Sequence, residues 1–165
     1  MARDLENEFV SADGWPRDLQ AFAMASLFWG GFLLVRVIFA LRAGAPAVPF
    51  EDVFLGVKFY ADHARVTMAL QAIIFAAFAI GILMHHRWAL VLALLYMAQV
   101  IIGHAIFIAS NLGVESQHIH VKIASIESPV VLLIGLYVWY RARPLLTPTS
   151  SKVGVAPARD KEPRE

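Results

Sequence analysis

Four polar side chains lie inside stretches of the chain that are otherwise apolar: Arg36, Gln71, His104 and Glu127. Ionisable groups within membrane-spanning helices are costly and nearly always face protein, where they find partners. A histidine and a carboxylate in an environment of low dielectric can titrate near neutral pH. Together the four residues predict a site for a proton, a metal or a small anionic or quinone-like ligand.

The four residues are expected at a common depth. Each lies four or five positions inward from the same edge of its apolar stretch, which places it roughly 6 to 8 Å below that edge. Because Arg36 and Glu127 have opposite charges, we expect them to pair, with His104 or Gln71 hydrogen-bonded to one of them. Two other interpretations stay open: the polar layer only joins helices, or Arg36 extends its charge to the membrane surface.

The composition indicates a membrane protein. Of the 165 residues, 59% are hydrophobic and 16% charged, and the mean hydropathy is +0.62, whereas soluble domains are about half apolar and a quarter charged. Continuous apolar runs without alternation favour helices over a barrel. The predicted fold is an all-α bundle of four antiparallel transmembrane helices in one domain, residues 1–143, followed by a disordered cytoplasmic tail, residues 144–165. The expected spans are about 17–42, 63–84, 88–110 and 119–141.

The connection between the first two spans is expected to form a short helix. After Pro46 and Pro49, apolar residues recur at helical spacing from Phe50 to Ala61. Such a segment can lie on the membrane surface or extend the second helix. We favour the short interfacial helix between helices 1 and 2.

Small residues predict one close helix contact. Gly30 and Gly31 follow Ala23 and Ser26 in the first span, and small side chains let helix backbones approach closely in membranes.

The basic residues predict the orientation. With both termini on one side, more Lys and Arg gather on that side than on the other, which favours cytoplasmic N and C termini. We expect an integral protein of the lipid bilayer, in a bacterial cytoplasmic membrane.

The remaining histidines suggest weaker metal and haem sites. His63, His118 and His120 fall near one edge of the bundle and could contribute to a divalent metal site, and a b-type haem would need two facing imidazoles. Neither group is predicted as a cofactor. Gln99 projects about 140° away from His104, so it need not share a pocket with that residue, and we expect it to hydrogen-bond a neighbouring helix.

The sequence offers little sign of enzymatic chemistry. It has no cysteine, and we find no GxSxG, P-loop or HExxH motif. The net charge of +1 is spread along the chain, so nucleic acid is not an expected partner.

In outline the architecture resembles small bacterial four-helix membrane proteins, among them those called DoxX-like. The resemblance implies a fold but no functional residue. The expected role is an accessory or structural membrane subunit, in a homo-oligomer or a larger membrane complex. The alternative is a binder or carrier of a small ligand, metal or proton at the polar layer, with a haem b or quinone redox subunit as a further variant.

Overall fold

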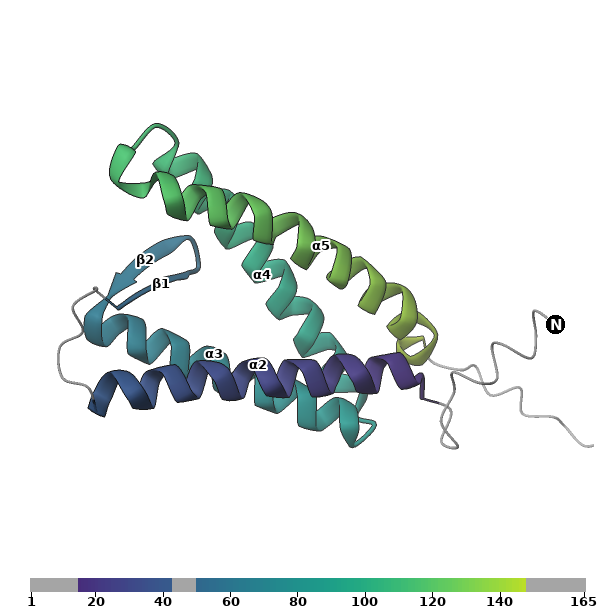
Figure 1. Ribbon diagram of the computed structural model, residues 1–165. Helices are drawn as coiled ribbons and strands as arrows, with labels where there is room; N and C mark the ends of the chain where they lie inside the picture. The colour runs from purple at the N-terminus through teal and green to yellow at the C-terminus, as the bar shows by residue number, and fades with distance from the viewer. Residues whose placement is uncertain (1–14, 43–49, 148–165) are drawn as a thin grey trace, which may run out of the picture.

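A computed structural model describes residues 15–42 and 50–147, and these residues are mostly helical (Figure 1). Four helices are long and apolar enough to cross a membrane, which confirms the predicted number. The elements, in chain order, are α2 (Arg17–Arg42), β1 (Glu51–Phe54), β2 (Val57–Tyr60), α3 (Ala61–Leu83), α4 (Arg87–Asn111), a short 3-10 turn η1 (Glu115–Gln117) and α5 (His118–Leu146). Of the predicted tail, residues 144–146 belong to α5, and residues 148–165 lie outside the described residues.

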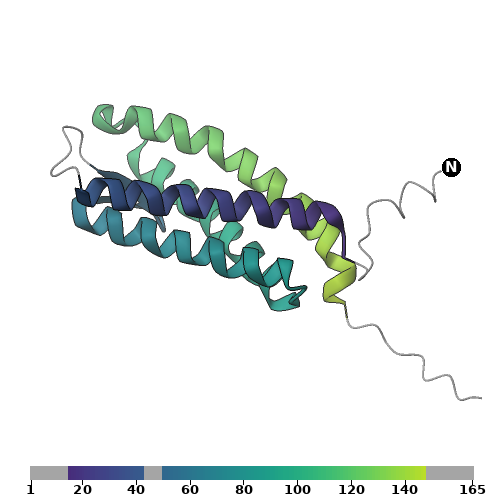
Figure 2. The same ribbon diagram turned by 60° about the horizontal axis from the view of Figure 1, so that its bottom comes forward.

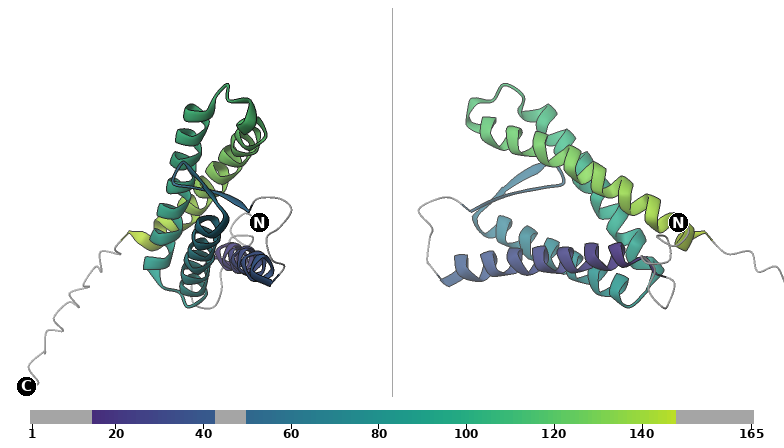
Figure 3. Two further views of the ribbon diagram at one scale, coloured as in Figure 1. Left: turned by 90° about the vertical axis from the view of Figure 1, so that its left-hand side faces the viewer. Right: turned by 45° about the vertical axis from the view of Figure 1, so that its right-hand side comes forward.

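The helices form two pairs that diverge. α2 packs along α3, α5 packs along α4, and α3 contacts α4 (Figures 1 and 2). The pairs meet where Trp15 stacks on His85 and Arg141 contacts Asp18; we call this the terminal end. They separate toward the opposite end, where β1 and β2 lie between them (Figure 3); we call this the hairpin end.

The apolar core lies at the terminal end. Its fully buried members are alanines and larger apolar side chains in equal number, namely Leu19, Ala23, Phe78, Ala79, Ile82, Ala89, Leu90, Ala93, Val138 and Ala142. Lipid tails are as apolar as leucine, so helices in a membrane associate through close packing of small residues. The alanines therefore explain why the two helix pairs meet here.

The predicted close contact along α2 is confirmed at Gly30. A Cβ atom added to Gly30 would lie 2.9 Å from the Cβ of Phe75 and 3.2 Å from the carbonyl oxygen of Ala72, whereas one added to Gly31 would meet nothing within 4 Å. Ala23 and Ser26 are buried on the same helix. One glycine of the pair thus makes the contact with α3.

The predicted interfacial helix between the first two spans is wrong, because the segment forms a β-hairpin. β1 and β2 are antiparallel, with Glu51 opposite Tyr60 and Phe54 opposite Val57. The two turn residues, Leu55 and Gly56, both have positive φ, at 54° and 78°, as a two-residue type I′ turn requires. Apolar residues at helical spacing misled the sequence interpretation, whereas Gly56 between two runs of aromatic and β-branched residues is typical of a hairpin.

The tip of the hairpin docks on α4 through two glycines. A Cβ atom on Gly56 would lie 2.9 Å from the side chain of Ile106 and 3.1 Å from the carbonyl oxygen of Gly103, and a Cβ atom on Gly103 would lie 3.0 Å from the backbone nitrogen of Gly56. The two backbones can approach this closely only because neither residue has a side chain. This contact fixes the hairpin between the two helix pairs.

Candidate functional site

The hairpin carries a carboxylate into the bundle. Asp52 on β1 accepts hydrogen bonds from Thr67 Oγ1 at 2.5 Å and from Gln71 Nε2 at 2.8 Å, both on its Oδ2 atom. Thr67 and Gln71 are four residues apart on α3, so one face of that helix supplies both donors. The aspartate therefore joins the hairpin to α3.

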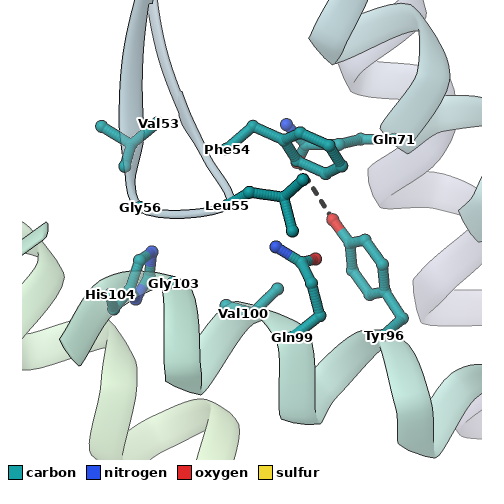
Figure 4. A pocket seen from close by; sticks show the side chains of 10 residues that line it. All are labelled: Val53, Phe54, Leu55, Gly56, Gln71, Tyr96, Gln99, Val100, Gly103 and His104. Atoms are coloured by element: carbon teal, nitrogen blue, oxygen red, sulfur yellow. Dashed lines mark hydrogen bonds between the residues drawn. The ribbon is translucent and has the colours of Figure 1, made fainter. Parts of the chain in front are cut away.

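The hydrogen bonds continue from α3 to α4. Tyr96 donates its hydroxyl proton to Gln71 Oε1 over 3.0 Å, as the dashed line in Figure 4 shows. Because the amide of Gln71 donates to Asp52 and accepts from Tyr96, the same side chain connects β1 with α4. Charged acceptors make the stronger hydrogen bonds in such a network, so we regard Asp52 as its centre.

Burial is the largest influence on Asp52 and raises the pKa of its carboxyl group above the usual 3.8. The hydrogen bonds from Thr67, Val53 and Gln71 oppose this effect, as does the positive charge of Arg36. Desolvation disfavours the charged form of a carboxyl group, and hydrogen bonds to the carboxylate favour it. The net result is a carboxyl group that takes up a proton more readily than a free aspartate.

Arg36, which the sequence paired with Glu127, lies beside the hairpin instead. Its guanidinium is 5.5 Å from the centre of the Phe50 ring, and its charge acts on Asp52. Glu127 Oε2 is 3.8 Å from His104 Nε2. In the part of the chain that the structure describes, no ion pair joins Arg36 to Glu127, because Arg36 lies near Phe50 and Glu127 faces His104.

A second polar group ties the hairpin to α5. Glu51 on β1 is 2.9 Å from His120 Nε2 and 2.8 Å from Lys58 Nζ, and Lys58 donates to Gln117 Oε1 over 3.1 Å. The hairpin thus makes polar contacts with α3 through Asp52 and with the beginning of α5 through Glu51 and Lys58.

Gln71 and His104, two of the predicted site residues, line one small cavity beneath the hairpin tip (Figure 4). Its volume is about 20 Å³, which is enough for one water molecule. Its other lining residues are Val53, Phe54, Leu55, Gly56, Tyr96, Gln99, Val100 and Gly103.

Gln99 lines the same cavity as His104, although the helical spacing of the two residues did not require them to share one. We predicted a hydrogen bond between Gln99 and a neighbouring helix. The side-chain oxygen Oε1 of Gln99 does not make one, because it is buried with no hydrogen-bond partner among the described residues. A buried amide oxygen without a donor is unfavourable by about 1 to 3 kcal/mol. A water molecule in the cavity would supply that donor.

The predicted metal residues do not come together. His63 and His118 are exposed. His120 contacts the Oε2 atom of Glu51, and Lys58 contacts the same oxygen. Within residues 15–42 and 50–147, no group of three or more His, Asp, Glu or Cys residues is arranged to hold a metal ion.

Sequence reasoning missed Asp52 and Tyr96, which hold the network together. Asp52 lies in the segment that was expected to form a short interfacial helix, and Tyr96 is a lone tyrosine in an apolar span, where nothing marks its hydroxyl as a donor. Thr67 and Gln71 are four residues apart, so a helix over this span places them on one face. A strand assignment for residues 51–54 would have placed Asp52 and Val53 on opposite faces of the hairpin; in the structure one face meets α3 and the other lines the cavity beside α4.

Comparison with known proteins adds no relative. No protein-family model, no curated protein and no solved structure matches this chain.

Proposed function

We propose that this protein is an accessory or structural subunit of a membrane assembly, formed with its own copies or with a larger complex. In this proposal its four helices cross the bilayer antiparallel to one another, in a bacterial cytoplasmic membrane, with both termini in the cytoplasm. One observation carries the proposal: the polar residues at the hairpin end bind the hairpin to the helices, through Asp52 to α3 and through Glu51 to α5.

The size of the cavity supports a structural role for these residues. Pockets for small organic ligands usually measure about 300 to 1,000 Å³, whereas the cavity beneath the hairpin measures about 20 Å³. Asp52, Thr67 and Gln71 are already hydrogen-bonded to one another. The polar groups of these three side chains therefore hold the two strands against the helices.

The surface of α5 supports association with other membrane helices. The residues that face α4 follow one narrow seam with alternating steps of four and three positions: Ala124, Ser128, Val131, Gly135, Val138 and Ala142. This spacing is typical of helices that pack at a shallow crossing angle. Between residues 130 and 140 the other side chains of α5 are mostly large, apolar or aromatic, and exposed, so that lipid or helices of another subunit can cover them.

A photocrosslinking experiment tests the proposal. We would place a photoreactive amino acid at the exposed Val57 on the hairpin, and at the exposed Leu133 on α5 as a second site, and irradiate intact membranes. An accessory subunit gives adducts of discrete mass at one site or both. Monomer alone at both sites, in protein that still folds, would contradict the proposal.

The orientation is supported by the distribution of basic residues and can be tested separately. The native chain has no cysteine, so Ser116→Cys and Thr147→Cys each give a protein with a single thiol. We expect a membrane-impermeant maleimide added to intact cells to label the Ser116→Cys protein and spare the Thr147→Cys protein. The reverse pattern would invert the orientation.

A further inference from the structure

His104 and Glu127 face each other between α4 and α5, apart from the network around Asp52. The distance from His104 Nε2 to Glu127 Oε2 is 3.8 Å, and the side chains are 12% and 55% exposed. Both residues lie within helices that are apolar enough to span a membrane. An ionised carboxylate in such a position is unfavourable unless a positive charge or a proton compensates it.

Ser128 fixes the direction of the hydrogen bond at the other ring nitrogen. Its hydroxyl donates to the carbonyl oxygen of Ala124 over 2.7 Å, and a hydroxyl has a single proton to donate. The contact of 3.2 Å between Ser128 Oγ and His104 Nδ1 is therefore one in which Nδ1 carries the proton and Ser128 accepts it.

The protonation of Nδ1 determines what Nε2 presents to Glu127. A neutral imidazole has one N–H group, so with that group at Nδ1 the Nε2 atom has a free lone pair. A lone pair directed at an ionised carboxylate would be repelled. At a separation of 3.8 Å the arrangement favours one proton on the pair, either on Nε2, which gives an imidazolium beside a carboxylate, or on the carboxyl group.

No other charge in the immediate surroundings competes for this proton. The hairpin residues that share the cavity with His104 are apolar, from Val53 to Gly56. Asp52 is hydrogen-bonded to Thr67 and to Gln71, the residue that α3 contributes to the cavity, and Tyr96 of α4 donates to Gln71. Farther along α5, His120 contacts Glu51. Among the described residues, Glu127 is the one carboxylate within ion-pair distance of His104.

We propose that His104 and Glu127 form a proton-binding dyad that carries one exchangeable proton, either on Nε2 of the imidazole or on the carboxyl group, across an ion-pair distance of 3.8 Å. Ser128 is the positioning residue that fixes the tautomer. His104 also lines the cavity that contains Gln99. This inference goes beyond the accessory role and does not depend on it.

Nitrogen NMR of protein labelled with ¹⁵N at histidine tests the dyad, because the shifts report protonation at each ring nitrogen. Near pH 7 we expect His104 to be doubly protonated, or neutral with the proton on Nδ1 together with a protonated-carboxyl infrared band that Glu127→Gln removes. In Glu127→Gln, His104 should be neutral with its proton on Nδ1. A neutral His104 beside an ionised Glu127, or a neutral ring protonated at Nε2, would overturn the proposal.

Two controls make the result specific. His118→Gln removes the signal of an exposed histidine and helps to assign that of His104, and Glu115→Gln removes an exposed carboxylate and should leave the His104 shifts unchanged. If Glu127→Gln fails to fold, Ser128→Ala tests the same proposal. It should remove the preference of the neutral ring for the Nδ1 proton, and an unchanged preference would count against the role of Ser128 and the proton count derived from it.

Discussion

The two ends of the bundle are held together in different ways. At the terminal end, buried alanines bring α3, α4 and the two outer helices into direct contact. At the hairpin end the helix pairs separate, and two strands fill the space between them with polar contacts (Figure 1). Close packing needs small side chains, whereas separated helices need an inserted segment whose backbone and polar groups are satisfied.

The difference also appears in how charges are used. At the terminal end, Arg141 contacts Asp18 through Nε at 2.6 Å and Nη2 at 3.2 Å, and Tyr137 also donates to Asp18. This group lies at the rim of the apolar core. At the hairpin end, Asp52 lies among buried and partly buried side chains and organises the network itself. The terminal end should therefore depend on shape, and the hairpin end on hydrogen bonds.

The largest effect should come from adding volume at the terminal end. A Cβ atom on Gly81 would lie 2.5 Å from the Cβ of Ala89, so Gly81→Val forces α3 and α4 apart. We expect the free energy of unfolding to fall by about 3 kcal/mol, measured by thermal unfolding in detergent. Gly31→Val is the matched control, since a Cβ atom there meets nothing within 4 Å. Equal losses in both variants would show that helix propensity, and not packing, is responsible.

A smaller loss should follow from removing the centre of the hairpin network. Asp52→Ala leaves the amide of Gln71 without its acceptor, whereas the hydroxyl of Thr67 can still donate to the carbonyl oxygen of Ala64 at 3.0 Å. We expect a loss of about 2 kcal/mol in the free energy of unfolding. Asp52→Asn keeps a carbonyl oxygen that can accept both hydrogen bonds, so we expect most of the stability to remain. Protease cleavage within the hairpin would detect its release. If the Asp52→Asn protein were as unstable as the Asp52→Ala protein, the negative charge of Asp52, and not its ability to accept hydrogen bonds, would be what stabilises the hairpin.

Asp52 should also make a smaller contribution to the pH dependence of the unfolding free energy. Burial raises the pKa of its carboxyl group above 3.8 in the folded protein, so the folded state binds the proton more tightly than the unfolded state. The contribution of Asp52 is thus fully present below 3.8 and is lost as the pH rises through the raised pKa. Asp52→Asn should remove this part of the curve of unfolding free energy against pH. An identical curve for both proteins would contradict it.

The smallest effect is expected at the rim of the terminal end. Arg141→Gln removes the ion pair with Asp18, and partly exposed pairs are worth about 1 kcal/mol or less. A double-mutant cycle with Asp18→Asn isolates the coupling between the two side chains. A coupling larger than the loss in Asp52→Ala would mean that charge matters more at the terminal end than at the hairpin end.

Some of the candidate site could be predicted from the sequence. Gln71 and His104 were identified from their positions in apolar stretches, and both line the cavity. The predicted pairing of Arg36 with Glu127 failed because depth alone does not specify which neighbour a side chain meets. His104 contacts Glu127 because both lie beside the seam between α4 and α5, and Arg36 instead lies over the ring of Phe50, directly before β1.

The sequence by itself determined the four apolar helices, since their length and composition are local properties that lipid demands of any spanning segment. It also marked Gly30 and the polar positions within the spans. Only the tertiary structure decided that residues 51–60 form a hairpin, that Gly56 docks on Gly103 and that Asp52 joins Thr67 and Gln71. These features depend on contacts between residues far apart in the chain, and such contacts leave no periodic signal in a single sequence.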